Sequence, residues 1–310
     1  MQDCEAAPTE AAPTFASLLA EVERFWIPLP DKPEESAEGV LCALWRAACG
    51  TPVSVGRAER AGLPELDAAA RERLAALIDR KRAGVPLAHL TGRQSFMGLE
   101  LLAGPAALIP RKETEILGRA ALAKIQWIAE RQGEVRVLDA CTGSGNLALA
   151  YAHYEPQARV YASDLSAEAV ELARHNAAYT GLASRVEFRV GDLLEPFDAE
   201  PFLAVCDFLS CNPPYISTAK VKAMHPEISL FEPEAAFNGG VYGVSILTRL
   251  VRQARRFLKP GGWLGFEVGL GQGGMLARQL AKNPDFSIVE RFTDGAGEVR
   301  AILARTSPQA

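Results

Sequence analysis

The sequence has no long apolar run, no signal peptide and few cysteines, and these absences exclude several classes of protein. Its apolar stretches fall well short of the roughly 18 to 20 residues that a membrane-spanning helix needs. The N-terminal segment, MQDCEAAPTEAAPTF, has neither the basic start nor the apolar stretch of a signal peptide. The 6 cysteines form no CxxC pair and no cluster with histidine at metal-ligand spacing. We therefore expect a cytoplasmic protein with free thiols, no metal and no membrane partner.

Basic residues are also too few for a protein that works by coating phosphate backbones. The 310 residues carry a net charge of −5, and the acidic excess is concentrated in residues 1–40. Hydrophobic residues at 48% and charged residues at 23% are typical of globular proteins, and the length suggests two domains. We therefore do not expect a nucleic acid as the main partner.

The pattern along the chain divides it into four segments. Residues 1–14, rich in Ala, Pro, Thr and Glu, predict a mobile tail. Apolar residues at helical spacing, interrupted by proline and glycine, predict a helical domain over 15–90, and alternation with turns predicts a β-hairpin linker over 91–112. Over 113–306 strands and helices alternate, which predicts a mostly parallel sheet covered by helices. The expected strands are 135–140, 158–164, 185–192, 206–212, 262–269, 286–292 and 299–305.

The last helix of the predicted helical domain ends in three consecutive basic residues. Arg80, Lys81 and Arg82 precede Gly84, where cations interact favourably with the carbonyl end of a helix. We interpret them as a solvated helix end, with a docking patch for a partner as the alternative.

A glycine-containing turn follows the first strand of the predicted sheet. Glycines at such a turn let the backbone approach a ligand, and the start of the next helix offers oriented N–H groups. Turns of this kind serve several nucleotide-type ligands, and a tight turn without a ligand is the alternative. The candidate residues are Asp139, Cys141, Thr142, Gly143, Ser144 and Gly145.

Acidic residues end the next two strands. Asp164 lies about twenty residues beyond the glycines, where a carboxylate can bind both hydroxyls of a ribose. Asp192 ends the third strand, in a position to meet an adenine amino group. Either residue could instead be only a helix N-cap. The order and spacing of the glycine turn and the two acids favour an adenosine-bearing cofactor.

The fourth strand leads directly into the tetrapeptide Asn212-Pro213-Pro214-Tyr215. The Asn212 carboxamide oxygen and the Pro213 carbonyl can each accept one N–H of a planar NH2 group, while two prolines hold that carbonyl rigid. Tyr215 offers a flat face on which the planar group can stack. A conjugated nitrogen is a poor nucleophile, so a fixed electrophile such as a sulfonium methyl would be needed beside it. The alternative is a proline-rich strand exit without a ligand.

Taken together, these motifs resemble the class I S-adenosylmethionine-dependent methyltransferases, and within them the HemK-type glutamine methyltransferases. The resemblance runs from about residue 39 to residue 305. It is carried by the cofactor motifs and by RKRAGVPLAHLTG (80–92), ALIPRKETEIL (107–117), CNPPYI (211–216), LFEPEAAFNGG (230–240) and LKPGGWLGFEVG (258–269).

The resemblance implies a seven-stranded Rossmann-like α/β sheet whose last two strands form an antiparallel hairpin, preceded by a small helical domain that docks a protein substrate. It implies methylation of a glutamine side-chain amide in a peptide-chain release factor, at its Gly-Gly-Gln loop. We also expect a monomer. S-adenosylmethionine would be bound by Asp139, Cys141 to Gly145, Asp164, Leu165, Asp192, Leu193 and Asn212, and the acceptor by Arg111, Asn212, Pro213, Pro214 and Tyr215.

The chain departs from the family pattern at several positions. Cys141 replaces the usual first glycine of the cofactor loop, so we expect it at negative φ or strained. Lys112 replaces a usual proline, and residues 1–38 fit the family poorly. Arg111 and Glu232 could brace the mouth of the site or simply form ion pairs.

Three other functions stay open. The acceptor could be a glutamine of a ribosomal protein or another peptide, or an exocyclic amine of DNA or RNA, which presents the same planar NH2 group. The chain could also be a non-catalytic binding module that has kept the fold.

Overall fold

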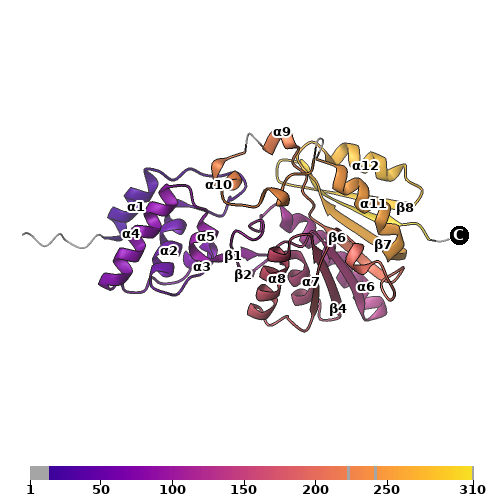
Figure 1. Cartoon of the computed structure of the whole chain (residues 1–310), viewed down its shortest axis with the longest axis horizontal. Coiled ribbons are helices and arrows are strands. Elements are labelled where there is room, and N and C mark those ends of the chain that lie inside the picture. Colours follow the sequence, from indigo (N-terminus) through magenta and orange to yellow (C-terminus); the bar gives the residue numbers. More distant parts are fainter. Residues whose placement is uncertain (1–13, 222–223, 241–242, 309–310) are drawn as a thin grey trace, which may run out of the picture.

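A computed structural model describes residues 14–221, 224–240 and 243–308. Residues 1–13 of the predicted tail therefore lie outside the described residues. The last residue of the predicted tail, Thr14, is instead the N-cap of the first helix, because its side chain accepts a hydrogen bond from the backbone N–H of Ser17. The molecule is elongated, with the N-terminal helices at one end and the sheet at the other (Figure 1).

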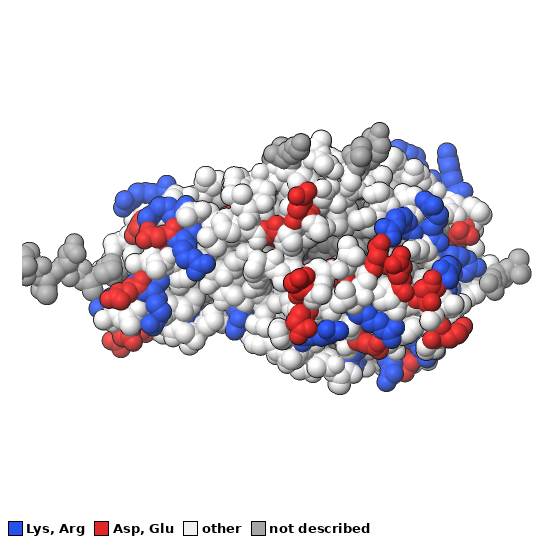
Figure 2. Space-filling model, viewed as in Figure 1, with Lys and Arg blue, Asp and Glu red and all other residues white. Residues whose placement is uncertain are grey.

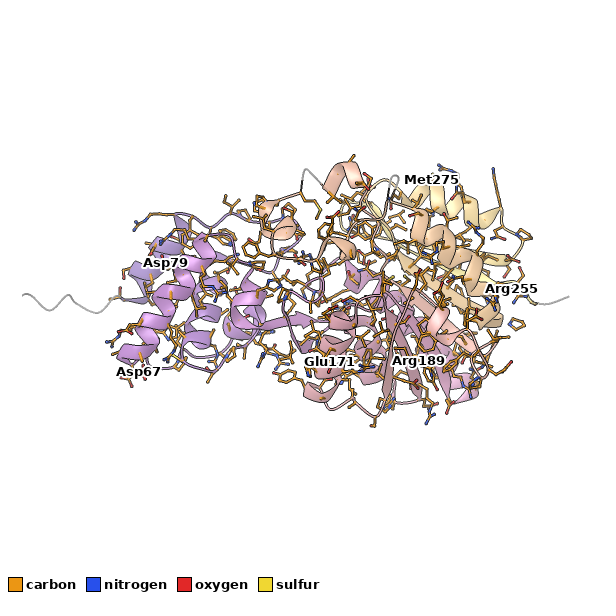
Figure 3. All side chains as sticks on the ribbon, viewed as in Figure 1. Asp67, Asp79, Glu171, Arg189, Arg255 and Met275 are labelled. Carbon is orange, nitrogen blue, oxygen red and sulfur yellow. The ribbon has the colours of Figure 1, made fainter. Side chains whose placement is uncertain are left out.

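Five helices form the N-terminal unit: α1 (Phe15–Glu23), α2 (Ala37–Ala48), α3 (Val55–Ala58), α4 (Ala68–Arg82) and α5 (Leu87–Thr91). Polar side chains begin the longer ones, with Ser36 capping α2 and Asp67 capping α4. Asp67 and Asp79 mark the two ends of α4 in Figure 3. The apolar faces of the helices share one core, centred on the fully buried Leu41 and Leu44 of α2.

An antiparallel hairpin, β1 (Arg93–Phe96) and β2 (Leu99–Leu102), follows the helices within the predicted linker. The seven-stranded sheet has the order β5-β4-β3-β6-β7-β9-β8. Its strands are β3 (Val135–Ala140), β4 (Ala158–Asp164), β5 (Val186–Val190), β6 (Cys206–Cys211), β7 (Leu258–Glu267), β8 (Phe286–Thr293) and β9 (Val299–Thr306). Neighbours are parallel from β5 to β7, whereas β9 is antiparallel to both β7 and β8. The predicted terminal hairpin is thus confirmed.

Successive side chains of the central strand β3 pack into two different cores, one on each face of the sheet. Val137 of β3 packs in the core formed with α6 (Thr114–Gln132), α7 (Asn146–Tyr154) and α8 (Ala167–Tyr179), whereas its neighbour Leu138 packs in the core formed with α11 (Ser245–Phe257) and α12 (Gly273–Ala281). The strand order reverses at β3, which has β4 on one side and β6 on the other. Ligands bind at the carboxyl ends of the strands at such a reversal in open α/β sheets.

The helix α12 was not predicted, and neither were four short helices of the sheet domain. One is η1 (Glu195–Phe197), after β5; the other three, α9 (Thr218–Val221), α10 (Pro226–Ser229) and η2 (Glu234–Ala236), follow β6. In Figure 1, α10 lies beside the N-terminal helices. On the face shown in Figure 2, acidic and basic side chains are interspersed. Among the described residues, no helix is both long enough and apolar enough to cross a membrane, and no group of three potential metal ligands comes together.

Buried charges connect the N-terminal helices to α10. Glu227 of α10 is 6% exposed, and its carboxylate contacts the ammonium groups of Lys32 at 2.5 Å and Lys81 at 3.2 Å. Lys81 is only 8% exposed, so the prediction of a solvated helix end is wrong for this residue, although Arg80 and Arg82 are exposed. Its charge is compensated by an acidic residue 146 positions away, which no local pattern could indicate.

Candidate active site

A pocket of about 220 Å³ lies where β3, β4, β5 and β6 end. Its wall contains residues that directly follow these strands, together with the loop after β2 and the segment around η2. A wider depression of about 530 Å³ lies along the opposite, amino edge of β4 and β5, and holds none of the predicted site residues. The smaller pocket is therefore the candidate site.

Most of the predicted site residues come together in this pocket, although they are far apart in the sequence. Those in its wall are Arg111, Cys141, Thr142, Gly143, Ser144, Asp164, Leu165, Asp192, Leu193, Asn212 and Pro214. Four others lie behind or beside the wall: Asp139, Gly145, Pro213 and Tyr215. Sequence reasoning missed the remaining lining residues, which are Ala106, Ala107, Leu108, Pro110, Thr114, Asn146, Ser166, Ala169, Pro233, Ala235, Ala236 and Ile246. Ala107 and Thr114 fall within ALIPRKETEIL, and Ala235 falls within LFEPEAAFNGG. These two family motifs could therefore have indicated that the three residues lie near the site.

The turn after β3 has left-handed backbone at three positions. Gly143 and Gly145 have φ of 54° and 81°. Cys141, which directly follows the strand, has φ of 55°. Cys141 is thus strained, which is one of the two expected outcomes for a residue at a family glycine position. Leu193, on the facing wall, also has positive φ, at 50°. Strained non-glycine residues cluster at functional sites, and both of these line the pocket.

Gly145 is required both by its backbone conformation and by its surroundings. A Cβ added there would lie 3.1 Å from the Ala173 Cβ and 3.3 Å from Phe188, both in the core. Gly145→Ala should therefore lower the free energy of unfolding by about 1 to 3 kcal/mol more than a change that imposes only backbone strain.

Gly271 provides the matched control, because its φ of 80° is almost the same and a Cβ there would meet nothing within 4 Å. Urea unfolding of Gly145→Ala and Gly271→Ala would measure the difference between the two changes. Equal destabilisation by both would show that crowding at Gly145 has no effect.

Asp139 supports the turn from behind. Its buried carboxylate accepts hydrogen bonds from the Thr142 hydroxyl at 2.6 Å and the Ser210 hydroxyl at 2.5 Å. Burial raises the pKa of Asp139 to about 6, and the two hydroxyl hydrogen bonds partly oppose this rise. The residue lies outside the pocket wall, so within this chain it holds the turn in shape.

Asp164 joins the turn after β3 to the start of α8. One carboxyl oxygen accepts from the backbone N–H of Gly143 at 2.8 Å, and the other accepts from that of Ser166 at 3.0 Å. Burial raises its pKa, and these backbone hydrogen bonds partly offset the rise. Beside it, Leu165 lines the pocket and is 69% exposed. The carboxylate is thus held in the wall next to an apolar side chain.

Asp192 has a partner that sequence reasoning did not include. Its carboxylate forms an ion pair at 2.5 Å with Arg249 of α11, and both side chains are partly exposed. The adjacent Leu193 carbonyl accepts a hydrogen bond from the buried Ser163 hydroxyl at 2.5 Å. The two residues are therefore anchored from α11 and β4.

The tetrapeptide after β6 has both of its predicted acceptors unoccupied. The Asn212 amide nitrogen donates to the Thr114 hydroxyl oxygen at 3.2 Å, and among the described residues none donates to the Asn212 oxygen or to the Pro213 carbonyl. Pro213 is buried, and Pro214 lines the pocket. Tyr215 lies behind the pocket wall, where its hydroxyl donates to Glu267 Oε1 at 2.9 Å.

Close backbone packing holds this tetrapeptide in place. A Cβ at Gly239 would lie 2.5 Å from the Pro214 carbonyl oxygen, and one at Gly243 would lie 2.1 Å from that of Tyr215. The side-chain amide of Gln272 donates to the same Tyr215 carbonyl at 3.0 Å. Rigid positioning of this kind is what an orienting group in an active site needs.

Arg111 both lines the pocket and pairs with acids, which combines the two roles considered for it. Its guanidinium lies 2.5 Å from the fully buried Glu232 and 3.3 Å from Asp31. Glu232 also accepts from the backbone N–H of Ile109 at 2.8 Å. The ion pairs thus join the loop after β2 to the segment after α10. Lys112, at the family proline position, pairs with Glu115 at 2.8 Å.

Comparisons with known proteins agree with this architecture. A family model described as "Methyltransferase domain" matches residues 132–267. The release factor glutamine methyltransferase of Moorella thermoacetica is 38% identical over 275 residues, which cover 88% of this chain and 92% of that protein. The protein of the same name from Gloeobacter violaceus is 37% identical, covering 79% of this chain and 83% of its own length.

A solved structure shares the fold at low sequence identity. The catalytic domain of human Mettl16, solved with an RNA hairpin, has a TM-score of 0.51 and 16% identity, covering 74% of this chain and 82% of that chain. This likeness concerns the fold alone, whereas the two bacterial relatives match 88% and 79% of this chain at more than 30% identity. The chain therefore belongs to the family of the release factor glutamine methyltransferases.

Proposed function

We propose that this protein transfers a methyl group from S-adenosylmethionine to the side-chain amide nitrogen of a glutamine in a peptide-chain release factor. The observation that carries this proposal is that one pocket combines Gly143 after β3 and Asp164 at the end of β4 with Asn212 after β6, whose amide oxygen has no donor among the described residues. The names of the two bacterial relatives supply the substrate.

The residues of the pocket fit S-adenosylmethionine. Ser144 Oγ and Arg111 Nη1 are buried and have no hydrogen-bond partner among the described residues, so polar groups remain for a ligand. A Cβ at Gly143 would meet only Ala107, at 3.9 Å, so the backbone is open on this side. Asp164 would bind the ribose and Asp192 would lie near the adenine, with Leu165 and Leu193 as apolar contacts. When bound, this cofactor would supply an electrophilic methyl group on its sulfonium.

The tetrapeptide after β6 would prepare the glutamine nitrogen for attack. The Asn212 oxygen and the Pro213 carbonyl would each accept one N–H of the amide, which aims the nitrogen lone pair and increases its electron density. No base is needed before the attack, because the amide N–H becomes acidic only after the nitrogen has been methylated. That proton would then leave to solvent, and a secondary amide would remain.

The helical N-terminal domain would dock the protein substrate. It has its own core, and the buried charges of Lys32 and Lys81 attach it to α10, which follows the proposed acceptor site in the chain. A protein bound across both parts would present a loop to the pocket.

Incubation of the purified protein with S-adenosylmethionine and a full-length release factor tests the proposed function. Tandem mass spectrometry should locate the mass of one added methyl group on a single glutamine, in the Gly-Gly-Gln loop of the factor. A factor with that glutamine replaced by alanine serves as the control. Cofactor binding without methyl transfer to the factor would contradict the proposal that a release factor is the substrate. Turnover on another protein or on a nucleic acid would identify that molecule as the substrate instead.

Replacing Asp164 with alanine should weaken S-adenosylmethionine binding by about 10- to 100-fold, because charged hydrogen bonds contribute about 1.5 to 3 kcal/mol. Asp164→Asn should have a smaller effect, since the amide oxygen can still accept a hydrogen bond from Gly143. Isothermal titration calorimetry would measure both dissociation constants.

The control for Asp164→Ala is Glu168→Ala, which removes a nearby charge from a residue outside the pocket wall. Its dissociation constant should stay at the unsubstituted value. Unchanged affinity in Asp164→Ala would remove the proposed ribose contact.

A further inference from the structure

The segment between α1 and α2 connects the helical domain to the loop that carries Arg111. Asp31 of this segment lies 3.3 Å from Nε of Arg111. Glu34 accepts a hydrogen bond at 3.1 Å from the side-chain amide of Gln94 in β1, and that amide also donates to the carbonyl of Pro110 at 3.0 Å. Two acidic residues of the helical domain thus reach the same loop, one directly and one through Gln94.

The guanidinium of Arg111 is held on two sides and free on the third. Nη2 donates to the fully buried Glu232 at 2.5 Å, and Nε faces Asp31. Nη1 is buried and has no hydrogen-bond partner among the described residues. Because Arg111 lines the pocket, this nitrogen is the donor left for a ligand there.

Arg111 lies at the acceptor end of the pocket. It precedes Thr114 by three residues, and the Thr114 hydroxyl accepts a hydrogen bond from the Asn212 amide at 3.2 Å. Asp192, where the adenine would lie, follows β5, and β5 is separated from β6 by β4 and β3 in the sheet. The free nitrogen is therefore better placed for the acceptor than for the adenine or ribose of the cofactor.

The charges around Arg111 indicate which chemical group it can bind. Glu232 and Asp31 place two carboxylates against one guanidinium, so the cluster carries an excess of one negative charge. This excess repels a carboxylate ligand and favours a neutral carbonyl oxygen. The oxygen of the reacting amide itself is a poor choice, because a donor there would draw electron density away from the attacking nitrogen. A main-chain carbonyl beside the acceptor glutamine fits both conditions.

We propose that Arg111 binds a main-chain carbonyl of the acceptor loop through Nη1, and that Asp31 is a positioning residue that holds the guanidinium for this contact. The inference deepens the proposed function and rests on it, because it concerns how the protein substrate is bound. Asp31 acts only through Arg111. The helical domain thereby contributes to the acceptor site itself as well as to docking.

Removing the Asp31 carboxylate tests this role. Asp31→Ala should raise KM for a full-length release factor about 3- to 10-fold, because a guanidinium that is free to move must be ordered again when the factor binds. The kcat at saturating factor and the affinity for S-adenosylmethionine should stay unchanged. Asp31→Glu, which keeps the carboxylate, should restore most of the KM. Glu38→Ala removes an exposed acid of α2 and is the matched control, with KM at its original value.

A double variant separates action through Arg111 from a general loss of structure. Arg111→Lys keeps a positive charge beside Glu232 but lacks the free Nη1 donor, so KM should rise about 10- to 100-fold. Adding Asp31→Ala to Arg111→Lys should raise KM no further, because both changes remove the same contact. Effects that multiply would overturn the inference. A loss of S-adenosylmethionine affinity in Arg111→Lys with KM unchanged would assign the free nitrogen to the cofactor and overturn it as well.

A further measurement does not depend on methyl transfer. In protein labelled with 13C and 15N at arginine, rotation of the Arg111 guanidinium about its Nε–Cζ bond should be slow in the unsubstituted protein and in Asp31→Glu, and faster in Asp31→Ala. Arg111→Lys would identify the resonance by its disappearance. If no release factor is methylated, the proposed function is contradicted, and the rotation rates still decide whether Asp31 holds Arg111. Equal rotation in the unsubstituted protein and in Asp31→Ala would overturn the role of Asp31.

Discussion

Replacing Asn212 with alanine should lower kcat by about 100- to 1,000-fold, which is the usual effect of removing one orienting polar group from an active site. The alanine leaves one N–H of the substrate amide without its acceptor, so the nitrogen is neither aimed nor activated. Affinity for S-adenosylmethionine should change by only a few-fold, because Asp164 and the loop of Gly143 would supply most of the cofactor contacts. Steady-state methylation of a release factor gives the first quantity, and calorimetry gives the second.

Asn283→Ala is a matched control for the Asn212 experiment. Asn283 is partly exposed, lies between α12 and β8, and does not line the pocket. Its replacement should leave both kcat and cofactor affinity at their original values. Normal turnover in Asn212→Ala would contradict the proposed mechanism, whereas a parallel loss of cofactor affinity would assign Asn212 chiefly to cofactor binding.

Replacing Glu227 with alanine should destabilise the protein by about 3 to 5 kcal/mol, because it leaves the buried charges of Lys32 and Lys81 without their partner. The nearby Glu35 lies 3.9 Å from Lys81 and can compensate only part of this charge. Burial already raises the pKa of Glu35, which shows how poorly solvated this region is. A fall in Tm and in the midpoint of urea unfolding would measure the effect.

Two further variants distinguish the loss of the buried ion pairs from other causes of lower stability. Glu171 on the outer side of α8, labelled in Figure 3, forms an exposed ion pair with Arg174. Glu171→Ala should therefore cost only about 0 to 1 kcal/mol. A variant with Lys32→Met, Lys81→Met, Glu227→Leu and Glu35→Gln should recover most of the stability lost in Glu227→Ala, since apolar side chains of similar size can replace a buried ion pair and the glutamine leaves no unpaired charge beside them. Equal stabilities of Glu227→Ala and Glu171→Ala would contradict the proposed contribution of the buried charges.

The strands of the central sheet could be predicted closely because their patterns are local. The expected bounds of β3 and β4 agree with the structure, and β6 ends one residue earlier than expected. All six residues of β6 are buried, including the polar Asp207 and Ser210. The residues that follow these strands therefore meet at one edge, which is why most of the site could be found without coordinates.

The segment between β6 and α11 could not be predicted in the same way. Its short helices α9, α10 and η2 have no apolar periodicity, and they depend on distant partners such as Lys32 for α10 and Arg111 for the residues before η2. The strand β7 also begins at Leu258, before the expected residue 262, because Leu258 pairs with Cys206 across an irregular register. Such pairings join residues that are far apart in the sequence, so no local stretch of sequence can indicate them.

The sequence by itself determined the order of the seven strands of the sheet and the polar residues that end the parallel strands, because these depend on periodicity and on turn chemistry. Only the tertiary structure decided which partner each buried polar group takes. Lys81 is buried against Glu227, Arg111 lies between Glu232 and Asp31, and Asn212 faces Thr114, all across long distances in sequence. The physical reason is that the electrostatic attraction within a hydrogen bond or ion pair is strongest where water is excluded. The packing of the whole chain determines which polar groups are shielded from water in this way.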